Sequence, residues 1–194
     1  MVLTDLTDEQ SIINAIAGSD YVVHTASPFD LNTKISDEQT LIKPAVDGTL
    51  AVCKASQMAK VKRVVITASV VSMMHSMTGT NNYSDKDWSD ITDPTINAYG
   101  KSKTLAEKAA WDFVKNLPEG EKFELATIHP ALTFGPNFVT EFSTSVDIMT
   151  SVMLKKIPGV PKMCMGIVDV RDVAQAHLAA IKVPEAAGKR FLMV

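Results

Sequence analysis

Residues 61–69 read VKRVVITAS, in which a basic pair precedes a β-branched run that ends in small hydroxyl residues. The unbroken apolar run at residues 64–66 is typical of a strand that is buried on both faces of a parallel sheet. Ser69 then stands at the carboxyl end of that strand, which is where ligands bind in open α/β sheets. We therefore expect Ser69 to face a ligand crevice, although a serine hydroxyl that only caps a loop is a common alternative.

Strand and helix patterns alternate along the rest of the chain. Short apolar runs predict strands, and apolar residues with a 3.6-residue period predict helices. Strands are expected at residues 21–24, 64–67, 123–128, 166–168 and 189–194, and helices at residues 9–17, 44–60, 99–116, 143–156 and 170–182. This order predicts an α/β fold with a doubly wound parallel sheet. The polar stretch 72–97 is expected to be a long loop, and such loops are usually functional.

Residues 99–103, YGKSK, place Tyr99 and Lys103 one helical turn apart at the start of a predicted helix. The apolar stripe of that helix comprises Ala106, Ala110, Phe113 and Leu117, and Tyr99 and Lys103 fall close to it. A lysine on the buried face of a helix is unusual. The simplest explanation is that its long side chain extends along the edge of the helix and places the ammonium in water.

A tyrosine and a lysine in this arrangement are suited to acid-base chemistry. A free tyrosine has a pKa of about 10, which makes it a poor proton donor or acceptor near neutral pH. A fixed positive charge favours the phenolate and lowers that pKa. Ser69, at the same edge of the predicted sheet, would be the third group, which holds a substrate oxygen.

Three segments carry a resemblance to a known family: residues 20–29 (DYVVHTASPF), residues 61–69, and residues 99–111 (YGKSKTLAEKAAW). Together they resemble the extended short-chain dehydrogenases/reductases of the NAD-dependent epimerase/dehydratase superfamily. The segment 99–111 is most similar to the branch of dihydroflavonol reductases, cinnamoyl-CoA reductases and aldehyde reductases. The resemblance runs through nearly the whole chain and implies a Rossmann-type NAD(P)-binding domain.

The resemblance also implies a role for each matching residue. Tyr99 would be the catalytic acid/base, Lys103 would lower its pKa and bind the ribose, and Ser69 would orient and polarise the carbonyl. The cofactor is expected to be NADP, with NAD as an alternative. The implied cofactor contacts are Asp5, Leu6, Thr25, Ala26, Ser27, Pro28, Tyr99, Lys103, Pro130, Leu132 and Thr133. Asp87 and Trp88 resemble a patch of the family's substrate loop and receive no chemical role.

One expected part of a dinucleotide site does not occur in the sequence. Such a site uses a glycine-rich turn between a strand and a helix, and the nine glycines of this chain form no such cluster. Residues 1–8 instead resemble the family's third strand and the turn after it, so we expect a Rossmann domain without its first strands, roughly two βα units. Residues 1–136 are assigned to that incomplete domain. Residues 137–194 are assigned to the start of a substrate lobe and a returning strand and helix, within one structural unit.

Three functions compete on these grounds. The first is an NAD(P)H-dependent oxidoreductase that acts on CH-OH or carbonyl groups, with its activity in question because the phosphate loop is missing. The second is a sugar-nucleotide epimerase/dehydratase or a hydroxysteroid dehydrogenase of the same superfamily, against which the matches at residues 25–28 and 99–111 argue. The third is a non-catalytic scaffold or binding protein that retains the catalytic residues.

Composition limits which binding partners and which cellular compartment we expect for this chain. The chain has 46% hydrophobic and 21% charged residues and a net charge of −3, with no basic block, which argues against nucleic acid and against an anionic membrane surface. No apolar run reaches the length of a membrane span, and Cys53 and Cys164 are expected to be reduced thiols of a cytoplasmic protein. The four histidines lack metal-ligand spacing and are assigned structural roles, so we expect a small-molecule substrate and no metal.

Overall fold

The computed structural model describes residues 2–28, 37–74, 82–138, 143–156, 159 and 166–194. Its main sheet is parallel and has the strand order β1-β2-β3-β6. These strands are β1 (Tyr21–His24), β2 (Arg63–Thr67), β3 (Glu124–Pro130) and β6 (Arg190–Met193). In the register, Val65 of β2 lies opposite Val23 on one side and Ala126 on the other. The predicted α/β class with a parallel sheet is therefore confirmed.

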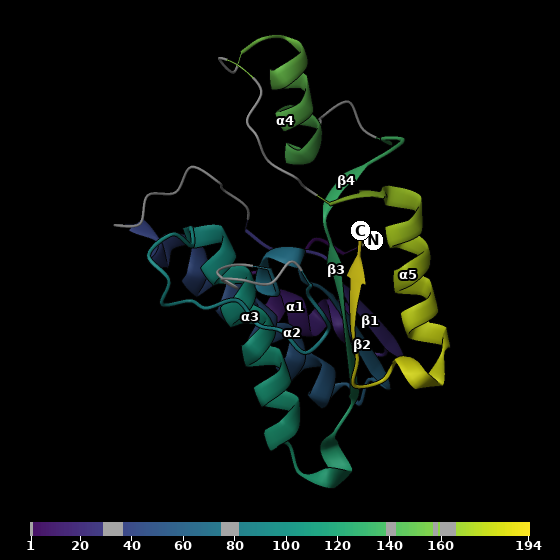
Figure 1. Ribbon diagram of the computed structural model, residues 1–194. Coiled ribbons are helices and arrows are strands. Elements are labelled where there is room, and N and C mark those ends of the chain that lie inside the picture. The colour runs from purple at the N-terminus through teal and green to yellow at the C-terminus, as the bar shows by residue number, and fades with distance from the viewer. Residues whose placement is uncertain (1, 29–36, 75–81, 139–142, 157–158, 160–165) are drawn as a thin grey trace.

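Helices cover both faces of this sheet (Figure 1). One face carries α1 (Glu9–Ile16), α2 (Gln39–Met58) and α3 (Ala98–Asn116), and the other carries α5 (Val170–Lys182). Val64 and Ile66 of β2 point into the core beneath the three helices, whereas Val65 points toward α5. This alternation explains why residues 64–66 are all apolar, since both faces of the strand are buried.

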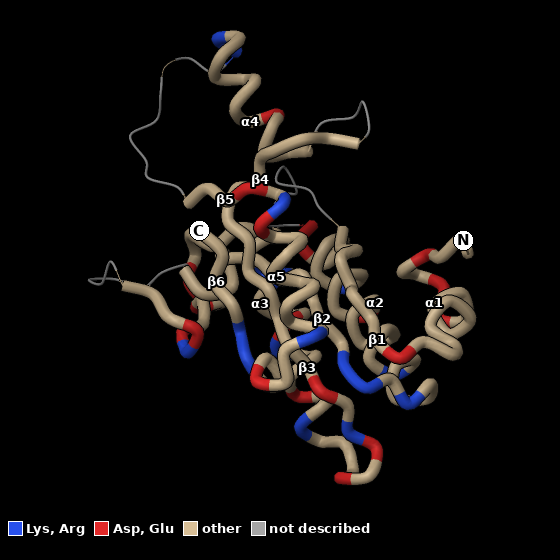
Figure 2. Tube along the Cα trace, turned by 90° about the vertical axis from the view of Figure 1, so that its right-hand side faces the viewer, with Lys and Arg blue, Asp and Glu red and all other residues tan. Residues whose placement is uncertain are grey.

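A smaller part of the chain lies beyond the carboxyl end of β3. There β4 (Leu132–Phe134) pairs in parallel with β5 (Ile167–Asp169), and α4 (Thr144–Met153) stands apart from the main sheet in both Figure 1 and Figure 2. No residue of α4 is buried in the described structure, and Met153 is largely exposed. Three short 3-10 helices complete the described elements: η2 (Val70–Ser72), η3 (Glu119–Glu121) and η4 (Pro184–Ala186).

Local sequence signals account for the helix ends. The Asp8 carboxylate accepts hydrogen bonds from the backbone at the start of α1, and Asp169 does the same at the start of α5. Gly18, which follows α1, has a φ of +77°, a conformation in which glycine avoids the strain of a side chain. These caps place the helix boundaries within a few residues of those predicted, except that α2 begins at Gln39, before the expected residue 44.

Two segments differ from the expected secondary structure. Residues 2–5 form no strand in the described chain, and Val2 and Leu3 are exposed, because a strand needs a hydrogen-bonded neighbour and the only described partner of β1 is β2. β3 continues to Pro130, past the predicted strand end at residue 128, because Pro130 lies opposite Met193 of β6. Only Ala131 separates the end of β3 from β4.

None of the helices formed by the described residues is both long enough and apolar enough to cross a membrane. Acidic and basic residues are interspersed along the described chain, as the red and blue segments of Figure 2 show.

Candidate active site

Ser69, Tyr99 and Lys103 come together at the carboxyl end of β2. Ser69 precedes η2, and its side chain hydrogen-bonds with that of Tyr99 in the first turn of α3. The Lys103 ammonium donates to the backbone carbonyl of Thr67, with 3.3 Å between Nζ and O. Ser69 and Lys103 are 7% and 8% exposed, so both are held inside the protein rather than on its surface. The structure thus places the three predicted side chains in one site.

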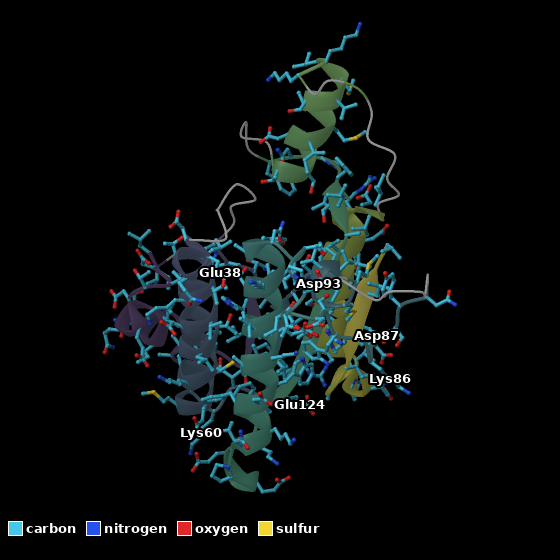
Figure 3. The ribbon with its side chains drawn as sticks, turned by 60° about the vertical axis from the view of Figure 1, so that its left-hand side comes forward. Glu38, Lys60, Lys86, Asp87, Asp93 and Glu124 are labelled. Atoms are coloured by element: carbon cyan, nitrogen blue, oxygen red, sulfur yellow. The ribbon has the colours of Figure 1, made fainter. Side chains whose placement is uncertain are left out.

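The start of α3 fixes the position of Tyr99. The Asn97 side chain accepts a hydrogen bond of 2.8 Å from the Gly100 N–H and so caps the helix. A Cβ at position 100 would lie only 2.9 Å from the Ile96 side chain. Glycine has no Cβ and so avoids this clash. Glu38, labelled in Figure 3 at the start of α2, forms an ion pair of 2.7 Å with Lys101 and ties the two helices together. The tyrosine therefore projects from a capped and braced helical turn.

Burial shifts the pKa values of both ionisable groups in the site. Burial raises the pKa of Tyr99 above its ordinary value, and the hydrogen bond with Ser69 opposes this shift. Burial also lowers the pKa of Lys103 to about 8, against the opposing charge of Glu107. The sequence suggested that Lys103 lowers the pKa of Tyr99, whereas in this structure the lowering influence comes from Ser69. The Lys103 ammonium donates to the Thr67 carbonyl, and its predicted effect on the pKa of Tyr99 stays a prediction.

Most of the predicted cofactor contacts lie at the same edge of the sheet. Thr25, Ala26, Ser27 and Pro28 follow β1 directly, and β1 is the parallel neighbour of β2. Pro130 ends β3, and Leu132 and Thr133 begin β4. These residues therefore follow the carboxyl ends of adjacent strands, where a doubly wound sheet binds its ligand.

Asp5 and Leu6 occur in a different setting, in the turn before α1. The Asp5 carboxylate accepts hydrogen bonds from the backbone and hydroxyl of Thr7, and these bonds lower its pKa. Leu6 packs against Gly48 of α2, where a Cβ would lie 3.3 Å from the leucine side chain. Both side chains have local structural roles, and their predicted contact with the cofactor stays a prediction.

Three of the four histidines lie in the described part of the chain, and His75 lies outside it, as does Cys164. The ring of His177 on α5 lies 2.7 Å from the Thr67 hydroxyl and 2.7 Å from the Val173 carbonyl. His24, at the end of β1, has its pKa lowered to about 4, first by burial and then by the positive charge of Lys103. That imidazole is therefore uncharged at neutral pH. The described residues contain no cluster of three potential metal ligands.

One functional candidate escaped the sequence reasoning, namely Glu107. Its carboxylate is buried below the site and forms an ion pair with Arg190 of β6. The spacing of Tyr99, Lys103 and Glu107 is a signal that could have revealed it, because residues four apart lie on one face of a helix. Residue type alone does not indicate this burial, because a glutamate is normally solvated.

The segment with Asp87 and Trp88 lies against the same arginine. The Arg190 guanidinium lies 3.8 Å from the centroid of the Trp88 ring and donates to the carbonyls of Asp85 and Asp87. Figure 3 shows the labelled Asp87 beside the yellow strand β6. Part of the predicted long loop is therefore fastened to the sheet.

Comparison with known proteins identifies similar chains. Residues 1–190 match the 3-beta hydroxysteroid dehydrogenase/isomerase family. The NADPH-dependent methylglyoxal reductase GRE2 of Saccharomyces cerevisiae is 35% identical over 190 residues, which cover 89% of this chain and 55% of that protein. An anthocyanidin reductase of Vitis vinifera is 36% identical over 201 residues, which cover 95% of this chain and 58% of that protein.

A solved structure agrees with this similarity. The crystal structure of yeast methylglyoxal/isovaleraldehyde reductase Gre2 complexed with NADPH superposes with a TM-score of 0.84 at 30% identity. The match covers 97% of this chain and 61% of that one. The chain thus spans less than two thirds of the length of these relatives and has the fold of the corresponding part of the solved structure.

Proposed function

Because this chain belongs to the 3-beta hydroxysteroid dehydrogenase/isomerase family, we propose that it carries the reaction site of an NADPH-dependent reductase of small carbonyl compounds. The observation that carries the proposal is the hydrogen bond between Ser69 and Tyr99, with the Lys103 ammonium buried one turn further along α3. The relatives named above, both reductases by name, favour reduction over sugar-nucleotide chemistry.

In the proposed reaction, each of the three side chains has a separate role at the substrate oxygen. Tyr99 delivers a proton to that oxygen as negative charge develops on it. The Ser69 hydroxyl, already directed at Tyr99, donates a hydrogen bond to the same oxygen, and a donor fixed in advance contributes most where charge appears. The Lys103 ammonium supplies a positive charge whose position is set by the Thr67 carbonyl.

The donors of the site fit the chemistry of a nicotinamide cofactor. An ammonium has three protons, and the bond to Thr67 uses one of them, so Lys103 has donors for the ribose hydroxyls. The residues proposed to hold the cofactor are Thr25–Pro28 after β1, Pro130 at the end of β3, and Leu132 and Thr133 in β4. Reduced nicotinamide supplies a hydride for the carbonyl carbon when it is bound. NADPH is proposed rather than NADH because the yeast relative depends on NADPH.

The proposed substrate is an uncharged aldehyde or ketone, and the proposed location is the cytoplasm. The hydroxyls and the ammonium of the site are hydrogen-bond donors, which suit a carbonyl oxygen because it accepts hydrogen bonds. A cytoplasmic location agrees with Cys53, which is a free and buried thiol in this structure.

Titration with NADPH tests this proposal against the non-catalytic alternative. We expect the chain to enhance or shift NADPH fluorescence, with saturation below millimolar cofactor, and we expect Lys103→Met to weaken that binding. Lys101→Met is the matched control, because Lys101 lies on the same helix but pairs with Glu38 away from the site. Absence of binding at millimolar NADPH would favour a scaffold that retains the residues without the activity.

A further inference from the structure

A buried ion pair lies beneath the Ser69, Tyr99 and Lys103 side chains. Glu107 is 1% exposed, and Arg190 donates to both of its oxygens, with 2.7 Å between Nε and Oε1 and 3.1 Å between Nη2 and Oε2. Burying two charges costs free energy that good pairing geometry only partly recovers, so the pair is expected to add little net stability to the fold. Its neighbours indicate a more specific role.

Glu107 is connected to the backbone of Ser69 through two side chains. The Ser72 hydroxyl lies 2.8 Å from Glu107 Oε2 and 2.9 Å from the Ser69 carbonyl. The His129 ring lies 3.2 Å from Glu107 Oε1 through Nε2 and 3.1 Å from the same Ser69 carbonyl through Nδ1. Two side chains thus bridge one carboxylate and one peptide group. The Ser72 hydroxyl has a single proton, which it shares between these two acceptors, and the His129 ring presents one nitrogen to each of them. That peptide group sets the direction of the Ser69 side chain.

The other side of the ion pair holds the segment that follows η2. Arg190 donates from Nη1 to the carbonyls of Asp85 and Asp87, at 2.9 and 2.7 Å, and stacks on the Trp88 ring. The Ser89 N–H in turn donates to the Ser72 carbonyl at 2.9 Å. The carboxylate therefore lies at the centre of a network that includes both the Ser69 turn and residues 85–89.

We propose that Glu107 is a positioning residue, which fixes the η2 turn so that the Ser69 hydroxyl points at Tyr99 and which, through Arg190, holds residues 85–88 against the same turn. This inference rests on the proposed function, because the aim of Ser69 matters only if its hydroxyl holds a substrate oxygen. Residues 85–88 then form a fixed wall beside the reaction site.

The pKa of Glu107 agrees with a positioning residue that keeps its charge. Burial raises the pKa of Glu107, but hydrogen bonds from His129 and Arg190, together with their charges, outweigh it and bring the pKa to about 2. The carboxylate is therefore ionised at neutral pH. Its charge also favours the protonated form of Lys103.

Hydrogen exchange of backbone amides, followed by NMR on the chain without cofactor or substrate, tests the proposal. The reporters are the N–H groups of Ser72 and Met73, which donate to the carbonyls of Ser69 and Val70 inside the turn. In Glu107→Gln, we expect these two amides to exchange about tenfold faster or more, since a hydrogen bond to a charged group is lost. The amides of the central strand β2 should change by less than about threefold.

Two further variants keep the test decisive. Ser72→Ala removes one bridge and no charge, and it should accelerate the Met73 amide even if Glu107→Gln does not fold. Thr104→Val is the matched control on α3, because it removes a buried hydrogen bond to the Gly100 carbonyl outside the network, and it should leave the turn protected. Unchanged exchange in the turn, or equal acceleration in the turn and in β2, would overturn the proposal in favour of a purely structural charge. Because no cofactor is present, this outcome is independent of whether the chain reduces carbonyl compounds.

Discussion

Replacing Lys103 with methionine is expected to stabilise the folded protein at neutral pH. The buried ammonium has a pKa of about 8, against an ordinary value of 10.5, so the folded state binds this proton less tightly than the unfolded chain does. This difference corresponds to about 3 kcal/mol of destabilisation below pH 8. Methionine has a similar length and no charge, but it loses the bond to the Thr67 carbonyl, so the net gain should be about 2 kcal/mol.

The pH dependence of this gain distinguishes the charge from side-chain packing. Between pH 8 and pH 10.5 the unfolded chain holds more protons than the folded one, so the wild-type protein gains stability as the pH rises through this window. The advantage of Lys103→Met should therefore shrink, and the cost of the charge in the wild type should fall to about 1 kcal/mol by pH 10.

Urea unfolding at pH 7, 8, 9 and 10 measures this difference in the free energy of unfolding. Lys101→Met is the control on the same helix, and loss of its half-buried ion pair with Glu38 should cost about 1 kcal/mol or less at neutral pH. A Lys103→Met protein that is less stable than the wild type at pH 7, or whose advantage does not vary with pH, refutes the reasoning.

Two further predictions concern the core that supports the site. Arg63 is buried and donates to the carbonyls of Ala180 and Val183 at the end of α5, each at 2.6 Å, so Arg63→Met should lower the free energy of unfolding by about 3 kcal/mol or more in urea titrations, and an effect below 1 kcal/mol would contradict this role. Burial raises the pKa of the Cys53 thiol to about 12, so a thiol reagent at pH 8 should react with it only after unfolding, and fast labelling of the native protein would disprove its burial.

The order of strands and helices was accessible from the sequence because each element carries its own local signal. The run at residues 64–66 is apolar on both faces, and α3 starts at the expected place because Asn97 caps it. Residues 2–5 show the limit of such signals. The family resemblance of residues 1–8 implied a strand there, but strand formation depends on a hydrogen-bonded neighbour, which no local pattern contains.

The sequence predicted which side chains lie together at the end of β2, but it did not predict their hydrogen-bond partners or their charges. Spacing alone placed Tyr99 and Lys103 on one face of a helix. The Lys103 ammonium donates to the Thr67 carbonyl, and a contact with a backbone group leaves no signal in the sequence. The burial of Glu107 depends on Arg190, which is 83 residues away in the chain. Long-range pairs of this kind arise from the topology of the sheet and could not be read from the pattern of one helix.

The rate of NADPH oxidation by Tyr99→Phe, in the presence of a small aldehyde, tests the central claim most directly. Phenylalanine keeps the ring and removes only the hydroxyl, and proton transfer by a positioned group contributes at least about a hundredfold to such reactions. We expect the wild-type chain to oxidise NADPH, and we expect the variant still to bind NADPH but to turn over at least about a hundredfold more slowly. Turnover by Tyr99→Phe within about tenfold of the wild-type rate would contradict it.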